Sequence, residues 1–208
     1  MGNLTVKSLR VGEVIVFLGK LQLFWLLASL RHGIILGVFP TMVTVMEYLQ
    51  QAFVRRAGFE VKKFVFDQKV KAYFRMSNQA GFLSLLVIGI LWVNLRIAWV
   101  FIQSTPLTVT LGFFSALVVS TILYVFPVLT RYDLQLKDVF IQAFYLMISN
   151  FSNTLAMYLG TFFSLMLAIF IPVLVLLPVP FVLLPIVWFS WQSMRKLEIA
   201  NGISVEIQ

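Results

Sequence analysis

The sequence predicts an all-α polytopic integral membrane protein, a bundle of transmembrane helices that forms a single domain over residues 1–208. Hydrophobic residues make up 61% of the chain and charged residues only 12%, whereas a soluble domain carries about 25% charged residues. Apolar runs of about 20 residues also recur along the chain, and each is long enough to cross a hydrocarbon core of roughly 30 Å. No separate soluble domain is therefore expected.

Six apolar segments follow one another, and each is expected to form a transmembrane helix. They are residues 12–30, 33–54, 82–103, 107–130, 152–174 and 176–194. Arg31 and His32 separate the first two segments, and a short polar loop separates the third from the fourth. An alternative interpretation merges residues 17–39 into one helix that tolerates Arg31. That alternative gives five spans and an N-terminus outside the cell.

Basic residues orient these spans, because cytoplasmic loops of membrane proteins carry an excess of Lys and Arg. Most of them lie in two polar connectors, residues 55–79 and 131–150, or follow the last span. They are Arg55, Arg56, Lys62, Lys63, Lys69, Lys71, Arg75, Arg131, Lys137, Arg195 and Lys196. The short loops at 103–106 and 174–180 carry no charge. Six helices with both termini in the cytoplasm satisfy all of these placements.

The connector 131–150 is expected to contain an amphipathic helix. Its apolar residues recur at the spacing of one helical face. This face consists of Leu136, Val139, Phe140, Ala143, Phe144 and Met147. Such a helix lies along the inner membrane surface or docks into a groove of a partner. Two interpretations stay open: the helix packs on its own bundle, or Leu136, Val139, Phe140, Ala143 and Phe144 present a docking face to another subunit.

A few polar or ionisable side chains fall inside the predicted spans, where a charge costs roughly 2.5 to 3.5 kcal/mol near the bilayer centre. The candidates are Lys20, Glu47, Asn94 and Arg96. Lys20 and Glu47 lie on adjacent antiparallel helices, so they are expected to pair, to reach separately to the interface, or to line a substrate path. Arg96 is expected to extend outward over Trp92 and Trp99, or to form with them an extracellular polar and aromatic patch.

No group of residues indicates catalysis. The chain has no cysteine and one histidine, which leaves neither a thiolate metal site nor converging histidine ligands. The zinc-protease, serine-hydrolase and P-loop motifs are also absent from the sequence. We therefore expect no enzyme activity, no metal and no cofactor. Although the net charge is +8, the basic residues flank membrane spans, so membrane lipid and not nucleic acid is the expected partner.

Three stretches of the sequence are similar to the YesL family of bacterial membrane proteins, the domain of unknown function 624. They are GVFPTMVTVMEYL at 37–49, YFRMSNQAGFL at 73–83, and LYVFPVLTRYDLQLKDVFIQAFYLMISN at 123–150. The pattern VFP-x-L-x-R-Y-D-L-x-L-K within the third stretch is the most specific. The first span departs from the family pattern, because Arg31 and His32 interrupt it. The resemblance implies a protein of the bacterial plasma membrane, in a family of Gram-positive bacteria.

The resemblance also implies a role near an ATP-driven carbohydrate uptake system, because such genes typically lie beside those of the family. It transfers no functional residues. The leading expectation is a non-catalytic accessory or permease-like subunit of a carbohydrate ABC importer, in contact with the permease or ATPase subunits. The alternative is a self-contained small-solute transporter or substrate-capturing membrane protein with a site near Lys20 and Glu47.

Overall fold

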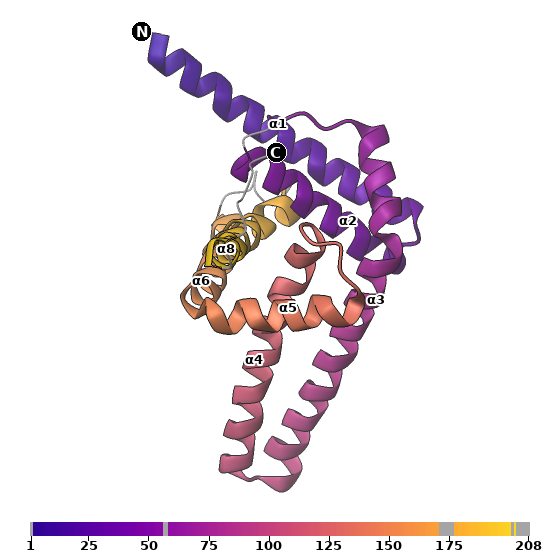
Figure 1. The fold of residues 1–208 in the computed structure, drawn as a ribbon, viewed down its shortest axis with the longest axis vertical. Coiled ribbons are helices and arrows are strands. Elements are labelled where there is room, and N and C mark those ends of the chain that lie inside the picture. Colours follow the sequence, from indigo (N-terminus) through magenta and orange to yellow (C-terminus); the bar gives the residue numbers. More distant parts are fainter. Residues whose placement is uncertain (1, 56–57, 171–176, 201, 203–208) are drawn as a thin grey trace.

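The computed structural model describes residues 2–55, 58–170, 177–200 and 202, with side chains of the first helix described from residue 12 onward. Its elements are all helical in these residues (Figure 1). They are α1 (Gly2–Arg31), α2 (Ile34–Leu49), the π-helical turn η1 (Gln50–Val54), α3 (Lys63–Ile97), the π-helical turn η2 (Ala98–Ile102), α4 (Thr105–Leu129), α5 (Leu136–Ser149), α6 (Phe151–Phe170) and α8 (Pro178–Ala200). The predicted all-helical class is confirmed for this part of the chain.

A sharp turn joins α1 to α2. Gly33 adopts a φ of 75°, a left-handed conformation that glycine tolerates far better than residues with a Cβ atom. The two helices then pack closely, because an added Cβ at Gly37 would lie 2.5 Å from the Ser29 carbonyl oxygen. The alternative single helix over 17–39 is therefore wrong. Residues 17–31 belong to α1, and the chain reverses before α2 begins.

The α1–α2 turn lies beside the first half of α3. Arg31 Nη1 is 3.4 Å from Asp67 Oδ2, and the ring centroids of His32 and Phe74 are 5.9 Å apart. The predicted six-span map put this turn and the connector 55–79 on opposite faces of a membrane. The structure contradicts that separation, since residues 31–32 and 67–74 are in contact.

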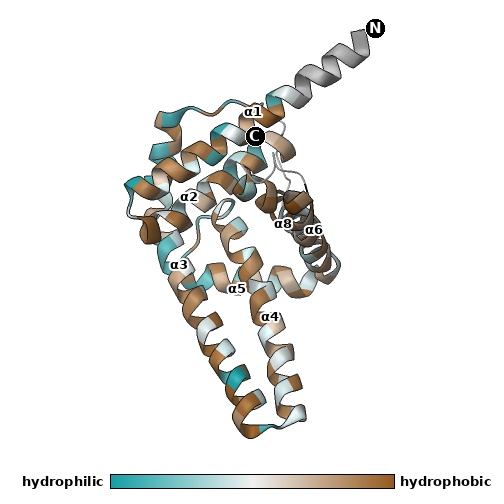
Figure 2. Cartoon of the chain, turned by 180° about the vertical axis from the view of Figure 1, so that it is seen from behind, coloured by the Kyte–Doolittle hydropathy of each residue, from teal (hydrophilic) through white to brown (hydrophobic). Residues whose placement is uncertain are grey.

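The predicted connector 55–79 and the predicted span 82–103 share one long helix. α3 and η2 run without a break from Lys63 to Ile102, which at 1.5 Å per residue is about 60 Å long. Gln103, with a φ of 55°, then reverses the chain into α4. The apolar half of α3 and α4 form a hairpin that projects from the remaining helices and is largely hydrophobic (Figures 1 and 2). We call it the α3–α4 hairpin.

α5 crosses the base of this hairpin, and α6 and α8 pack against each other beside it (Figure 1). A hydrogen-bonded cluster joins α4, α6 and α8. Tyr124 Oη lies 3.0 Å from Thr154 Oγ1 and 3.3 Å from Ser193 Oγ, and Asn153 Nδ2 donates to the same serine over 2.9 Å. Because Tyr124 is fully buried, these bonds satisfy its hydroxyl inside the apolar core.

Four helices are long and apolar enough to cross a membrane: Gly12–Arg31, Lys63–Ile102, Thr105–Leu129 and Phe151–Phe170. The predicted count of six is therefore not reproduced in the described residues. α2 has 16 residues, most of them buried, so it is a core helix rather than a lipid-exposed span. α8 starts at Pro178 and carries charges in its last turns. The predicted boundaries at 174 and 176 lie outside the described residues.

Candidate functional site

Polar and charged side chains from five parts of the chain meet near the end of α2. We call this set the polar layer. It consists of Glu47, Gln50, Gln51, Lys69, Thr130, Arg131, Tyr132 and Glu198. The residues come from α2, η1, α3, the loop between α4 and α5, and α8. Only 12% of the residues in this chain are charged, so a cluster of polar and charged side chains is a candidate functional site.

Glu47 forms the first part of the polar layer. Its Oε1 accepts hydrogen bonds from the Lys69 ammonium and from Gln51 Nε2, the latter over 3.0 Å. Lys69 also lies over the Tyr48 ring, with its nitrogen 5.0 Å from the centroid. The predicted pairing of Glu47 with Lys20 is therefore wrong. Glu47 binds a cation from α3, while Lys20 is exposed on α1.

Gln50 connects α2 to the loop that follows α4. Thr130 Oγ1 donates to Gln50 Oε1 over 3.3 Å, and only 2% of the Gln50 surface is exposed. The position falls where α2 widens into the π-helical turn η1. Because a buried amide without a partner is costly, this bond helps fix the loop against α2.

Arg131 and Glu198 form the most enclosed ion pair described. Arg131 Nε donates to Glu198 Oε1 over 2.6 Å, and its Nη2 donates to Oε2, which is the bidentate geometry that suits guanidinium and carboxylate. Only 12% of the Arg131 side chain and 9% of the Glu198 side chain are exposed. The guanidinium also stacks near Trp191, 5.8 Å from the ring centroid. The pair ties the α4–α5 loop to the end of α8.

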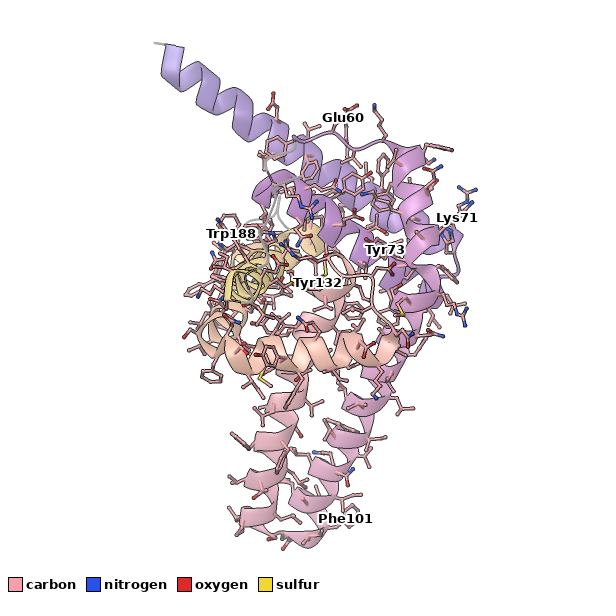
Figure 3. All side chains as sticks on the ribbon, in the orientation of Figure 1. Glu60, Lys71, Tyr73, Phe101, Tyr132 and Trp188 are labelled. Atoms are coloured by element: carbon pink, nitrogen blue, oxygen red, sulfur yellow. The ribbon has the colours of Figure 1, made fainter. Side chains whose placement is uncertain are left out.

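Tyr132 completes this arrangement. Its hydroxyl donates to Glu198 Oε1 over 2.8 Å. Burial, followed by the hydrogen bond and the charge of Glu198, raises the pKa of Tyr132 above its usual range. The tyrosine therefore stays protonated and remains a hydrogen-bond donor. Figure 3 shows Tyr132 in the body of the protein, far from the tip of the α3–α4 hairpin marked by Phe101.

Sequence reasoning missed Glu198 as a site residue. It follows the predicted last span, beyond which the sequence predicted no further helix, whereas α8 continues to Ala200. In the sequence, Arg131 indicates only orientation, and Tyr132 indicates only the family resemblance. The available signal was the acidic residue beside Arg195 and Lys196, but its partner lies 67 positions away in the sequence, beyond any local pattern.

Asn94 and Arg96 lie apart from the polar layer, on the α3–α4 hairpin. Asn94 Nδ2 donates to the carbonyl of Ile90 in its own helix over 2.7 Å. Arg96 lies near Trp92, with its guanidinium carbon 5.8 Å from the ring centroid. Trp92 lies further from the tip of the hairpin than Arg96, so the predicted outward extension over Trp99 stays a prediction. Asn94 and Arg96 are therefore not brought together with Lys20 or Glu47.

The five residues of the predicted docking face of α5 differ in how far they are buried. Val139 and Ala143 are fully buried in the protein's own core, so they cannot meet a partner. Leu136 and Phe140 are half-buried, and Phe144 is 49% exposed. α5 is also less amphipathic than predicted, because its outer side exposes further apolar residues. These are Ile141, Tyr145 and Ile148.

Phe140 and Phe144 line a hollow between the helices of the α3–α4 hairpin, with a volume of about 370 Å³. We call it the apolar cleft. Its other lining residues are Leu83, Ser84 and Val87 of α3 and Phe114, Leu117, Val118, Thr121 and Ile122 of α4. Ser84 is buried, and its hydroxyl has no hydrogen-bond partner among the described residues. Because that oxygen is buried, the surface that the cleft presents is almost entirely apolar.

The described residues contain no group of three His, Cys, Asp or Glu side chains that could hold a metal ion. The polar layer offers ion pairs and hydrogen bonds, with one free oxygen at Glu47, whose Oε2 is buried without a partner in the described part of the chain. The apolar cleft offers a surface for a hydrophobic molecule or helix. The polar layer therefore holds helices together, and the apolar cleft is a surface suited to binding.

Residues 18–95 match the model of a family described as a protein of unknown function, DUF624. The matched segment runs from α1 through α2 to the apolar half of α3, and so it includes Glu47 and Lys69. No curated protein and no solved structure matches the chain.

Proposed function

From the match of residues 18–95 to the DUF624 family model, and from the apolar cleft, we propose that this protein is a non-catalytic accessory subunit of a bacterial carbohydrate importer. It associates through its α3–α4 hairpin and α5 with a membrane-spanning helix of the importer's permease. The single observation that supports this function most directly is that Phe140 and Phe144, predicted to dock a partner, line the cleft beside the hairpin.

The α3–α4 hairpin needs a covering of lipid or protein. Its large side chains are widely exposed, among them Trp92, Trp99, Phe101 and Phe113, and Phe101 is 80% exposed. Exposed apolar surface of this extent is rare on soluble monomers and marks membrane or partner contact. A hairpin that crosses the bilayer satisfies its backbone hydrogen bonds internally and presents these residues to lipid chains.

The apolar cleft is the part of this surface best suited to a partner. Helices pack in membranes through close steric fit, and polar side chains add hydrogen bonds between them. A transmembrane helix seated against Phe140 and Phe144 fills a concave apolar wall.

The polar layer fixes the orientation of α5, and so of Phe140 and Phe144, which line the apolar cleft. The α4–α5 loop is bound to α8 by Arg131 and Glu198 and to η1 by Thr130 and Gln50. These contacts limit how far α5 can tilt over the base of the hairpin. The proposed role of the ion pair is thus to position the docking surface.

The proposed orientation follows the distribution of basic residues. The first half of α3 carries Lys69, Lys71 and Arg75, and Arg31 lies beside it through Asp67. By the positive-inside rule this end faces the cytoplasm, and the tip of the α3–α4 hairpin lies at the opposite face of the bacterial plasma membrane. The partner itself, a carbohydrate importer, is proposed from the family resemblance alone.

Gentle detergent extraction from the native bacterium, affinity purification and mass spectrometry test this function. The wild-type protein is expected to bring along permease and ATPase subunits. F140D/F144D is expected to release them, because two carboxylates in the apolar cleft carry a large desolvation cost. The matched control is I141D/Y145D, which changes two exposed residues on the outer side of α5 that do not line the cleft, and it is expected to retain the partners.

Two results contradict the proposal. One is a protein that emerges alone and moves solute across vesicle membranes, which supports the alternative of a self-contained transporter. The other is equal retention of importer subunits by F140D/F144D and by wild type, which removes the apolar cleft as the docking surface.

A further inference from the structure

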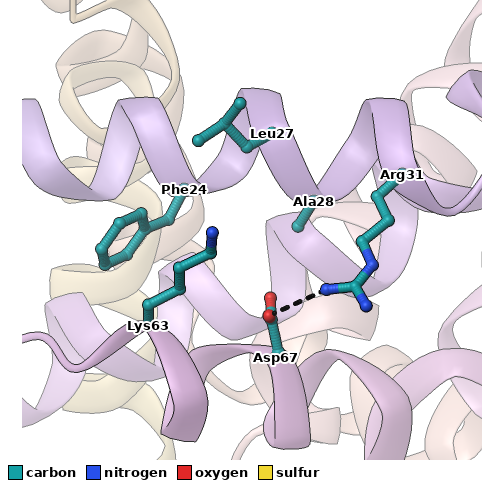
Figure 4. Close-up of a pocket in the computed structure, with 6 residues that line it drawn as sticks. All are labelled: Phe24, Leu27, Ala28, Arg31, Lys63 and Asp67. Atoms are coloured by element: carbon teal, nitrogen blue, oxygen red, sulfur yellow. Dashed lines mark hydrogen bonds and ion pairs between the residues drawn. The ribbon is translucent and has the colours of Figure 1, made fainter.

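A second hollow lies between α1 and the start of α3, and unlike the apolar cleft it has charged lining residues. It has a volume of about 180 Å³ and is lined by Phe24, Leu27, Ala28, Arg31, Lys63 and Asp67. Figure 4 shows the Lys63 ammonium and the Arg31 guanidinium directed into the space between the two helices. We call this hollow the basic pocket.

We propose that the basic pocket binds the headgroup of an anionic phospholipid, with the phosphate between Arg31 and Lys63 and an acyl chain along α1. The two cations outnumber the single carboxylate of Asp67, so the pocket carries a net charge of +1. Basic pockets beside transmembrane helices attract anionic headgroups in this way. The occupant is thus identified by the positive charge of the pocket together with its apolar lining.

Arg31 retains most of its binding capacity. A guanidinium has five N–H donors, and Arg31 uses one of them on Asp67 over a long 3.4 Å contact. The arginine side chain is 68% exposed, which makes this ion pair weak. Lys63 has no ion-pair partner among the described residues, in contrast to Lys62, which contacts Glu60. Both cations are therefore free to bind a phosphate.

The surroundings of the pocket favour a lipid over a soluble anion. Arg31 ends the apolar segment Gly12–Arg31, which is where a headgroup lies when that segment is in a bilayer. Phe24 and Leu27 form an apolar wall within the pocket itself. Leu23 and Leu30, exposed along the same helix, extend that wall for an acyl chain.

Native mass spectrometry of the detergent-solubilised protein, titrated with phosphatidylglycerol or with phosphatidylcholine, tests this inference. The wild-type protein is expected to bind phosphatidylglycerol more tightly than phosphatidylcholine. R31Q/K63Q is expected to weaken that binding by about tenfold or more, since each cation near an anionic headgroup contributes about a fivefold preference. Binding of phosphatidylcholine, which has no net charge, is expected to change little.

A matched control separates the pocket from general surface charge. K71Q/R75Q removes two exposed cations from the same helix, about two turns further along, and is expected to leave phosphatidylglycerol affinity within about twofold. D67N provides a change in the opposite direction. Loss of the competing carboxylate is expected to tighten binding about fivefold, an increase that a misfolded protein cannot produce.

Three results overturn the proposal. Equal loss in R31Q/K63Q and K71Q/R75Q shows a diffuse electrostatic effect, and unchanged affinity in D67N shows that the anion does not enter the pocket. Displacement of the lipid by millimolar inorganic phosphate, with no dependence on acyl chains, shows a soluble-anion site instead. Gel filtration of each variant checks that the fold is retained, and R31K/K63R is expected to bind as wild type does.

Discussion

At the scale of single residues, the Arg131–Glu198 pair has the greatest structural consequence. It is bidentate and enclosed, and Tyr132 adds a third hydrogen bond to the same carboxylate. Removal of one partner leaves an uncompensated charge in a buried position, which typically costs about 3 to 5 kcal/mol. Because the pair joins the α4–α5 loop to α8, the loss is also expected to loosen α5.

We expect R131M and E198L each to lower the free energy of unfolding by about 3 kcal/mol. The double variant R131M/E198L is expected to lose much less than the sum of the two, because no charge is left unpaired. Unfolding in mixed micelles, followed by circular dichroism, measures these values. The control is the exposed Glu60–Lys62 pair, whose coupling is expected to stay within about 0.5 kcal/mol. Additive losses in R131M/E198L contradict the assigned role.

At the scale of elements, the helices depend on how closely their backbones approach. An added Cβ at Gly37 would lie 2.5 Å from the Ser29 carbonyl oxygen and 2.8 Å from the Ser29 Cα. Those are backbone atoms, which cannot move aside without separating α1 from α2. Gly89, in the α3–α4 hairpin, has no atom within 4 Å of an added Cβ.

We therefore expect opposite results from two identical substitutions. G37A lowers the apparent melting temperature in detergent, because α1 and α2 must separate. G89A leaves it unchanged or raises it, since alanine is favoured over glycine inside a helix by about 1 kcal/mol. Thermal unfolding of both variants under one set of conditions measures the difference. Destabilisation by G89A as large as that by G37A contradicts the close α1–α2 contact.

The elements also show what local sequence can and cannot predict. The apolar runs predicted the tip of the α3–α4 hairpin, the bounds of α4 and the start of α6 within a few residues, because length and hydropathy determine such helices locally. The six-span map built from the same apolar runs placed Arg31 and residues 55–79 on opposite faces of the membrane. That failed because the Arg31–Asp67 contact is tertiary. Glu47 pairs with Lys69 and not with Lys20, and this too is a tertiary contact. No local pattern indicated Glu198.

At the scale of the whole molecule, the structure has two parts that meet at α5. One is the α3–α4 hairpin, with exposed apolar surface along its length, and the other is the body formed by α1, α2, α6 and α8 (Figure 1). The polar layer lies in the body, and the apolar cleft lies where α5 meets the hairpin. Both proposed binding surfaces depend on the first half of α3 and the α1–α2 turn lying at one membrane face.

Cysteine labelling in intact cells tests that placement most directly, because the native chain has no cysteine and single cysteines can be added at will. We expect H32C and K71C to react with a membrane-impermeant maleimide from the same side, and T105C, at the tip of the α3–α4 hairpin, to react from the other. Reaction of H32C together with T105C, with K71C on the opposite side, contradicts the account.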